Sequence, residues 1–497
     1  MDLNIRKGDL TLEKCDALII NFFVGDKNLG GATGAVDKAL GGLLGRILKE
    51  EHFAGKEGDV CYIRPAKFSA KRIFVVGLGE RKDFCEETVR NVAAASYTAA
   101  DKVGAKHVIS ILHGAGNGTL TAKAAARAMI EGIRLAAYGF HRYKRKKNKP
   151  QIKLFEIVTD DGKAVRDALN VLPVAEAYAS ATIFARDLVN TPSLHMTPLE
   201  LVETARGLVK NNKSLRLKVF GRAALEKMGA GGVLGVAQGS DHEPFLAHLI
   251  YYPKKVAQKK IALVGKAITF DSGGLSLKPA GEMMNMKIDM AGAAVVLGVF
   301  SVLEKLDVQQ EVHGIFAACE NMPSGKAVRP GDVLKLMNGK TIEILNTDAE
   351  GRVTLADSLV YAAKQKPNMI IDVATLTGAC MVALGEEITG LMSNDAALAD
   401  KILQSAAVAG EKMWQLPLEK KYKNQIRSEV ADYRNIADRY GGALTAGLLL
   451  EEFVGDGKWA HLDIAGPAFA EKPLNAYTPR GGSGHSVRTI LEFLRQK

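Results

Sequence analysis

The sequence has few cysteines, only two tryptophans and no long apolar run. Its five cysteines are widely spaced over 497 residues and form no Cys-x-x-Cys pair, which argues against the disulfide framework of a small secreted protein. Free thiols in a reducing compartment explain them most simply. We find neither a charged and then apolar N-terminal leader nor an uninterrupted apolar stretch of about 18 residues. We therefore expect a soluble cytoplasmic protein with no membrane partner.

Length and composition favour more than one domain. A chain of 497 residues exceeds the usual size of one domain, and 47% hydrophobic residues suffice for two cores. Strand-like and helix-like stretches alternate, which is typical of α/β architecture. In the first third, the patterns predict strands over 16–23, 72–77 and 107–113, and helices over 86–103 and 120–138.

The remainder of the chain suggests a connecting helix and a larger second domain. An alanine-rich stretch from Pro173 to Leu188 indicates the connection. We assign 1–160 to an N-terminal α/β domain, 161–190 to the connecting helix and 191–497 to the larger domain. Strands are predicted over 216–220, 248–252, 261–264, 312–317 and 369–374, and helices over 291–306, 354–364 and 396–409. The Gly-x-Gly at Gly77 and Gly79 lacks a third glycine and is interpreted as a turn.

The sequence also lacks a His-Glu-x-x-His segment, and none of His313, His461 and His485 is near another histidine at ligand spacing. A zincin-type protease is therefore disfavoured. Acidic residues offer a different metal site. Four of them, in two glycine-containing segments, are Asp271, Asp289, Asp348 and Glu350.

Carboxylates of this kind can bridge a pair of hard divalent cations, and four of them converging without cations would repel one another. In an extended segment, Asp348 and Glu350 would face the same side, with Arg352 continuing the row. Acidic residues are also common as caps and solvated loop residues. The pattern alone leaves both interpretations open.

The sequences of these two segments resemble those of the cytosolic leucyl aminopeptidase family, the M17-type dinuclear metallo-aminopeptidases. Residues 346–353 read Asn-Thr-Asp-Ala-Glu-Gly-Arg-Val and match the family signature at seven of eight positions, with Val353 in place of leucine. Residues 265–279 match its metal-binding stretch, with Ala267 where glycine is usual. Segments 187–192, 375–378 and 459–466 extend the resemblance. It implies two domains, the first similar to a macrodomain and the second a catalytic domain with a mixed central sheet flanked by helices.

The resemblance also implies the ligands of two metal ions. One ion is expected on Asp271, Asp348 and Glu350, assisted by the Asp348 carbonyl, and the other on Lys266, Asp271, Asp289 and Glu350. Lys266 can bind a metal only as the neutral amine, which requires a lowered pKa; the alternative is a solvated lysine. Manganese or zinc is expected, and magnesium or cobalt also suits such a site.

In this family two cations activate a water and polarise the scissile carbonyl, and Lys278 is expected to stabilise the oxyanion. Arg352 is expected to hold bicarbonate; the alternative is a structural ion pair. The resemblance places a substrate pocket that prefers leucine or another apolar N-terminal residue at Met286, Thr375, Gly378, Ala465 and Ala468. The alternative for each of these five residues is ordinary core packing.

Partners follow from the resemblance and from charge. Relatives form hexamers that admit short peptides, so a homohexamer is expected. The net charge is +11, and Arg142 to Lys149 form a dense basic run that is able to contact nucleic acid. A solvated loop is the favoured interpretation, because no recognised DNA-reading motif accompanies the run. A catalytically silent member is disfavoured, since every expected ligand is present.

Overall fold

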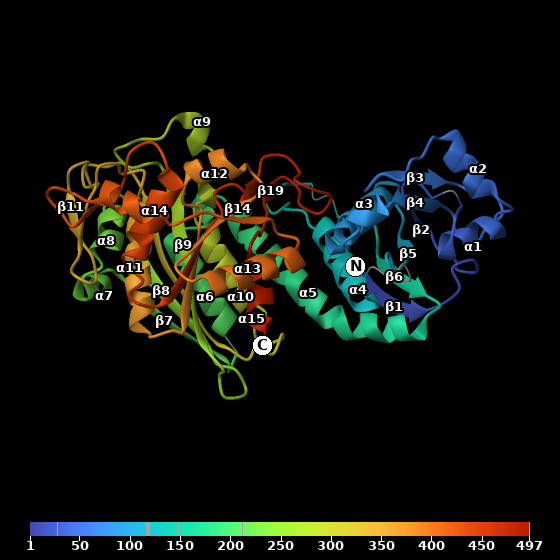
Figure 1. Ribbon diagram of the computed structural model, residues 1–497, viewed down its shortest axis with the longest axis horizontal. Coiled ribbons are helices and arrows are strands. Elements are labelled where there is room, and N and C mark those ends of the chain that lie inside the picture. The colour runs from blue at the N-terminus through green and yellow to red at the C-terminus, as the bar shows by residue number, and fades with distance from the viewer. Residues whose placement is uncertain (27, 116–119, 147–148, 211, 497) are drawn as a thin grey trace. The chain divides into compact units, whose positions relative to one another are not determined.

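The computed structural model describes the chain except residues 27, 116–119, 147–148, 211 and 497 (Figure 1). The chain divides into two compact units. The N-terminal unit comprises Met1–Ser180 with Pro473–Pro479, and the C-terminal unit comprises Ala181–Lys472 with Arg480–Lys497. Each unit contains a sheet with helices packed against it, so the predicted α/β class is confirmed.

The N-terminal unit is built on a six-stranded sheet in the order β1-β6-β5-β2-β4-β3, in which only β3 is antiparallel to its neighbour. The strands are β1 Asp2–Lys7, β2 Ala17–Phe22, β3 Val60–Ile63, β4 Ile73–Gly77, β5 His107–Ile111 and β6 Leu154–Thr159. The helices are α1 Gly31–Ala39, α2 Leu43–Glu50, α3 Glu86–Lys102 and α4 Ala122–Ala136. The predictions for β2, β4, β5, α3 and α4 agree with these bounds to within a few residues.

A single helix, α5 Gly162–Asn190, runs from the N-terminal unit into the C-terminal unit and contains Pro173. Within the described residues, it is the one helix long and apolar enough by composition to cross a membrane, yet half of its most apolar window is buried in the protein. Ala168, Val171 and Ala175 pack into the core of the N-terminal unit. A core helix passes the same test of length and hydropathy.

The C-terminal unit contains an eight-stranded mixed sheet in the order β15-β14-β17-β13-β9-β10-β8-β7. The strands are β7 Leu215–Phe220, β8 Phe245–Tyr251, β9 Lys260–Asp271, β10 Glu311–Asn321, β13 Met369–Ala374, β14 Thr389–Ser393, β15 Met413–Gln415 and β17 Lys458–Asp463. The four central strands β10, β9, β13 and β17 are parallel. Their carboxyl ends therefore meet at one edge, which is where open α/β sheets place their ligand sites.

Helices cover both faces of this sheet (Figure 1). They are α6 Pro198–Val209, α7 Arg222–Met228, α8 Gly231–Ala237, α9 Ala280–Met283, α10 Ala291–Phe300, α11 Gly351–Lys364, α12 Gly378–Leu384, α13 Ala396–Ala409, α14 Gly442–Glu451 and α15 Val487–Arg495. Gly265 approaches Gly292 of α10, whereas the next residue, Lys266, points to Gly351 of α11. Successive strand residues face opposite sides of a sheet, so α10 and α11 lie on opposite faces.

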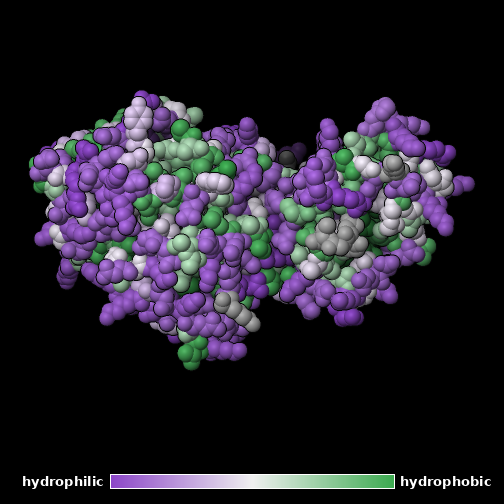
Figure 2. Space-filling model, in the orientation of Figure 1, coloured by the Kyte–Doolittle hydropathy of each residue, from purple (hydrophilic) through white to green (hydrophobic). Residues whose placement is uncertain are grey.

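Short strands complete the C-terminal unit: β11 Val333–Lys335, β12 Thr341–Glu343, β16 Tyr433–Arg434, β18 Phe469–Ala470 and β19 Gly481–Gly482. Its surface is largely hydrophilic in the view of Figure 2, with hydrophobic residues gathered over α12. There Met381 is 41% exposed and Val382 is 87% exposed. This helix begins at Gly378, one of the residues predicted to contact the substrate.

Candidate active site

The polar residues of the site lie at or just beyond the carboxyl ends of the four parallel strands. Asp271 ends β9, Asn321 ends β10, Thr375 follows β13 and Asp463 ends β17. The predicted strand over 261–264 is too short, because β9 continues through Lys266 to Asp271. A lysine within a buried strand needs charged partners, and three other segments of the chain supply them.

Lys266 is 4% exposed and lies among carboxylates. Its Nζ is 2.7 Å from Asp289 Oδ2 and 2.9 Å from Glu350 Oε1, and it donates a hydrogen bond to the Thr375 carbonyl at 2.9 Å. Burial opposes its charge, but Asp289, Glu350 and Asp271 outweigh burial and raise the pKa of Lys266 above its ordinary value. The alternative of a solvated lysine is therefore wrong. With the protein's own groups alone, Lys266 is the protonated counter-ion of these acids.

Lys278 forms ion pairs with the other two acids, Asp271 and Asp348. Its Nζ is 2.9 Å from Asp271 Oδ2 and 2.5 Å from Asp348 Oδ1. Asp271 Oδ1 accepts hydrogen bonds from the Gly273 amide at 2.9 Å and from Asn321 Nδ2 at 2.8 Å. Gly273 has φ +86°, and a side chain there would collide with the Ser276 carbonyl and with Asp348, so glycine permits this close turn.

The segment before α11 is a turn, and the expected extended row is wrong. Asn346 Oδ1 accepts the Asp348 amide at 2.9 Å, and the Asn346 carbonyl accepts the Ala349 amide at 3.2 Å. Such side-chain bonds to the backbone compete with strand geometry. Glu350 stands at the N-cap position of α11 without a side-chain capping hydrogen bond, and Arg352 lies in the first turn of the helix. Even so, one carboxylate oxygen from each of Asp271, Asp348 and Glu350 lies within 4.8 Å of the others.

The acids carry more negative charge than the nearby lysines neutralise. Four carboxylates, those of Asp271, Asp289, Asp348 and Glu350, face two ammonium groups. Burial raises the pKa of Asp271, Asp289 and Asp348, and neighbouring carboxylates raise all three further. Glu350 is 3% exposed, and among the described residues neither of its buried oxygens has a hydrogen-bond partner, although Lys266 is an ion-pair partner of Oε1 at 2.9 Å. Excess carboxylates with free oxygen lone pairs fit divalent cations.

Arg352 forms no ion pair among the described residues, so the predicted alternative of a structural ion pair is wrong. Its Nη1 donates to the Asn435 carbonyl at 3.0 Å, while its Nε is buried without a hydrogen-bond acceptor. Burial lowers the pKa of its guanidinium. A guanidinium with an unused donor is suited to binding a small anion.

The five residues predicted to contact the substrate fall in three segments that follow these strand ends. Thr375 donates from Oγ1 to Asp289 Oδ1 at 2.8 Å, which links the proposed pocket to the acids. Asp463 Oδ1 accepts the Leu376 and Ala465 amides, each at 3.2 Å, so it holds the loops after β13 and β17 together. Met286 and Ala465 are half-buried, Gly378 is exposed, and Thr375 and Ala468 are buried.

Three residues with structural roles in the site were missed by sequence reasoning. Asn321 Nδ2 reaches both Asp271 and, at 3.0 Å, the Thr347 carbonyl. Asn435, 1% exposed, accepts the Leu345 amide at 2.9 Å and donates to the Asn346 carbonyl at 2.7 Å. Asp463 is the third. An uncharged amide at the end of an apolar strand was the only signal for Asn321.

The histidines take no part in the acidic cluster. His313, which has no histidine near it in the sequence, contacts His248 in space with Nδ1 to Nε2 at 2.8 Å. The same ring reaches Glu311 at 2.7 Å, and His248 reaches the Tyr361 hydroxyl at 3.0 Å. Two ring nitrogens at this distance are joined by the N–H proton of one of them. Tyr361, His248, His313 and Glu311 therefore form a hydrogen-bonded chain.

The other sequence motifs lie in the N-terminal unit. Gly79 has φ +73°, and its amide donates to the Gly55 carbonyl at 2.9 Å, so this amide is already used within the fold. In the basic run, Arg142 to Lys146 and Lys149 are exposed, and residues 147–148 lie outside the described residues. Arg142 lies over the Tyr143 ring at 5.8 Å from its centroid.

Two family models match this chain. The catalytic domain of the cytosol aminopeptidase family matches residues 183–491, and the N-terminal domain of the same family matches residues 19–147. The chain belongs to the cytosol aminopeptidase family. It is accordingly a metal-dependent aminopeptidase, and the resemblance seen in the sequence is confirmed.

Curated relatives and solved structures agree with this membership. The chain is 40% identical to a probable cytosol aminopeptidase of Alkaliphilus oremlandii (strain OhILAs), covering 100% of this chain and 99% of that one. It is 45% identical to one of Thermosynechococcus vestitus, covering 92% of each. A mutant of tomato leucine aminopeptidase has TM-score 0.89 and 33% identity, covering 99% of this chain and 96% of that one. The bottromycin maturation enzyme BotP in complex with Mn has TM-score 0.86 and 36% identity, covering 97% and 99%.

Proposed function

We propose that this aminopeptidase removes leucine or another apolar residue from the N-terminus of peptides, using two bridged divalent cations. The observation that carries the proposal is the buried excess of carboxylates, with both oxygens of Glu350 lacking a hydrogen-bond donor. Asp271, Asp348 and Glu350 would hold one cation, with the Asp348 carbonyl assisting. Lys266, Asp271, Asp289 and Glu350 would hold the other.

The cations, when bound, would activate a water and polarise the scissile carbonyl. Manganese or zinc is proposed, and magnesium or cobalt would also suit carboxylate ligands; the Mn complex of BotP supports manganese. Coordination by Lys266 requires its neutral amine, so its proton must leave when a cation neutralises the surrounding acids. Asp271 and Glu350 are the proposed bridging ligands because each lies within reach of residues from both sets.

Lys278 and Arg352 are the proposed catalytic residues. Lys278 keeps its ammonium charged, because Asp271 and Asp348 raise its pKa although burial opposes the charge. A fixed cation beside the acids would stabilise an oxyanion that develops on the substrate. Arg352 would hold bicarbonate through its guanidinium, whose Nε has no acceptor among the described residues, and that anion would accept a proton during hydrolysis.

The substrate side chain would lie against Met286, Thr375, Gly378, Ala465 and Ala468. A flexible methionine beside small residues suits a leucine-sized apolar group. Exposed apolar side chains on α12, Met381 and Val382, extend this surface. The similarity to tomato leucine aminopeptidase supports the leucine preference. A cytoplasmic location and a homohexamer acting on short peptides remain part of the proposal.

Hydrolysis of leucine p-nitroanilide by the purified protein tests this function. Activity should disappear on chelation and return with manganese or zinc, and Glu350→Gln should remove at least 99% of it while retaining the wild-type melting temperature within a few degrees. Glu226→Gln, at an exposed position of α7, is the matched control and should keep full activity. Faster release of aspartate or proline than of leucine would overturn the specificity, and full activity in Glu350→Gln would overturn the metal assignment.

Nucleic-acid binding is a secondary possibility, supported by the exposed cations from Arg142 to Lys146. Binding through phosphates would weaken steeply as salt rises. A variant with these four cations, Arg142, Lys144, Arg145 and Lys146, replaced by alanine should lose any DNA retention at low salt and keep its peptidase activity. Unchanged retention in that variant would exclude the run as the binding surface.

A further inference from the structure

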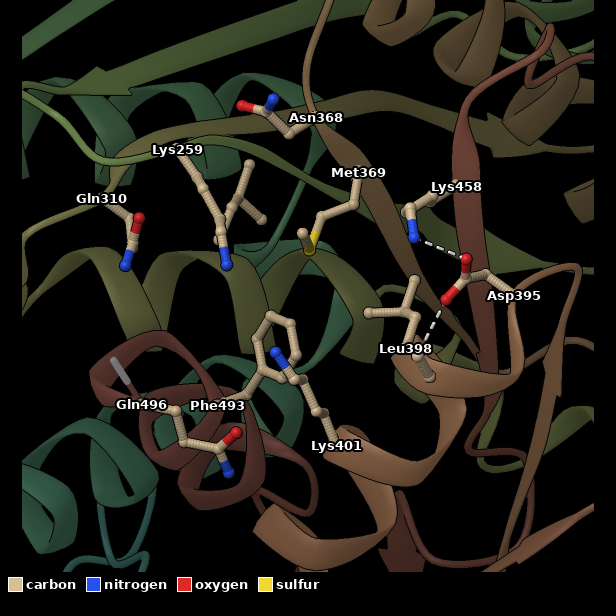
Figure 3. A pocket seen from close by; sticks show the side chains of 12 residues that line it. Lys259, Gln310, Asn368, Met369, Asp395, Leu398, Lys401, Lys458, Phe493 and Gln496 are labelled. Atoms are coloured by element: carbon tan, nitrogen blue, oxygen red, sulfur yellow. Dashed lines mark hydrogen bonds and ion pairs between the residues drawn. The ribbon is translucent and has the colours of Figure 1, made fainter.

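A cavity lies in the C-terminal unit, at the edge of the sheet opposite the acidic site (Figure 3). It has a volume of about 290 Å³ and borders the amino ends of β9, β13 and β17, together with α13 and α15. Parallel strands carry their amino and carboxyl ends at opposite edges. The cavity is therefore separate from the residues assigned to catalysis.

One wall of the cavity is apolar. Ile261, Leu398 and Phe493 are buried in the wall, at 3%, 3% and 7% exposure, and Met369 is half-buried beside them. In Figure 3 the Phe493 ring and the Met369 thioether point into the space. Aliphatic and aromatic walls of this kind take up an apolar group of a small ligand.

The rim is positively charged. Lys259 and Lys401 are exposed, and neither forms an ion pair with a described residue. Lys458 is neutralised by Asp395 at 2.6 Å, and the other oxygen of Asp395 caps α13 through the Leu398 amide at 2.8 Å. Three ammonium groups against one carboxylate leave two uncompensated cations, which favours an anionic ligand.

We propose that this cavity binds a small monocarboxylate that has an apolar body, such as an apolar amino acid whose nitrogen is acylated. The carboxylate lies between Lys259 and Lys401, and the side chain packs on Phe493 and Leu398. Because an acylated nitrogen is not the free amino terminus that an aminopeptidase processes, this site is independent of the proposed catalytic function.

Isothermal titration calorimetry of the full-length protein with N-acetylleucine tests the site. Saturable binding is expected, weakened at least tenfold when N-acetylleucinamide, which lacks the carboxylate, replaces the acid. Lys259→Ala combined with Lys401→Ala should weaken binding at least tenfold. Lys227→Ala, at an exposed position of α7, is the matched control and should bind like the wild type.

The catalytic variant Glu350→Gln separates this site from the active site. Unchanged affinity for N-acetylleucine in Glu350→Gln, together with lost affinity in the double lysine variant, supports the cavity. Absence of saturable binding at millimolar ligand would overturn the proposal, as would affinity lost in Glu350→Gln and retained in the double lysine variant. Because both lysines are exposed, their replacement should leave the melting temperature unchanged. Measuring that temperature checks that the variant is folded.

Discussion

At the scale of single residues, Asn321 connects the two segments that carry the acids. Its Nδ2 donates to Asp271 Oδ1 and to the Thr347 carbonyl, at 2.8 and 3.0 Å. The amide therefore fixes the orientation of one proposed bridging carboxylate relative to the turn that carries Asp348. Partners of this kind orient metal ligands and raise their affinity.

We expect Asn321→Ala to weaken the apparent affinity for activating metal by about 10–100-fold. The loss of both donors should also cost about 1–3 kcal/mol of stability, because the Thr347 carbonyl stays buried. Leucine p-nitroanilide hydrolysis measured against manganese concentration separates these effects, since saturating metal should restore most of the rate. Asn338→Ala, in an exposed turn, is the control. A variant with wild-type metal dependence would show that Asn321 has no positioning role.

At the scale of elements, α10 packs against the sheet at a distance that only glycine allows. A Cβ on Gly292 would lie 2.0 Å from the Val373 carbonyl oxygen and 2.6 Å from the Lys266 amide nitrogen. Both atoms belong to strand backbones that cannot rotate away. The contact places the amino end of α10, and with it Asp289, beside Lys266.

Gly292→Ala should therefore destabilise the C-terminal unit by about 3 kcal/mol or more and reduce activity with it. Gly281→Ala, in α9, is matched in chemistry but has nothing within 4 Å of the new methyl group, and should change stability by less than about 1 kcal/mol. Urea denaturation followed by circular dichroism compares the two. Equal stability of the two variants would contradict the close packing.

Many of the helices and strands were predictable from the sequence, and the errors in the prediction have physical reasons. Strand β13 and helix α13 begin and end where the apolar patterns predicted. The prediction ended strand β9 too early, because a charged residue such as Lys266 is typical of the end of a strand. In the structure, Asp289 and Glu350, more than 20 and 80 residues later in the chain, neutralise its charge. Strand β1 was not predicted, although polar residues alternate with Leu3 and Ile5 in the manner of a half-buried strand.

The residues of the candidate site were likewise predictable only in part. The acids and lysines stand in two short segments whose pattern and resemblance indicated them. Asn435 stands alone in its segment, and Asp463 lies in a segment that resembles the family but gives no sign of the residue's contacts. Both act by hydrogen bonds to loops about 90 residues away. Single-sequence patterns carry no information on such long-range contacts.

At the end of β5, the buried His113 couples stability to pH. It is fully buried, lies 3.2 Å from Asn21 Nδ2, and burial lowers its pKa from 6.5 to about 4. Between these values the unfolded chain binds a proton that the folded chain does not, so stability falls as pH drops from about 6.5 to 4. The full effect is roughly 3 kcal/mol.

We expect His113→Gln to show a smaller loss of melting temperature than the wild type when pH is lowered from 7.5 to 5. The comparison of the pH-dependent losses removes any constant cost of the substitution. His242→Gln, at an exposed position, should behave like the wild type. The same pH dependence in all three proteins would exclude His113 as the coupled group.

At the scale of the whole molecule, the expected assembly determines which substrates reach the site. Closed symmetric oligomers are the rule for soluble homo-oligomers, and the resemblance in the sequence implies six subunits with their sites facing an interior cavity. Each chain has a mass of 53.3 kDa, so light scattering after size exclusion should give about six times that, ~320 kDa. Enclosed sites should cleave leucyl dipeptides and tripeptides but leave a folded protein with N-terminal leucine intact. A monomeric mass, or equal rates on peptide and folded protein, would contradict the enclosed hexamer without affecting the proposed chemistry, because the described acids and lysines of the site come from one chain.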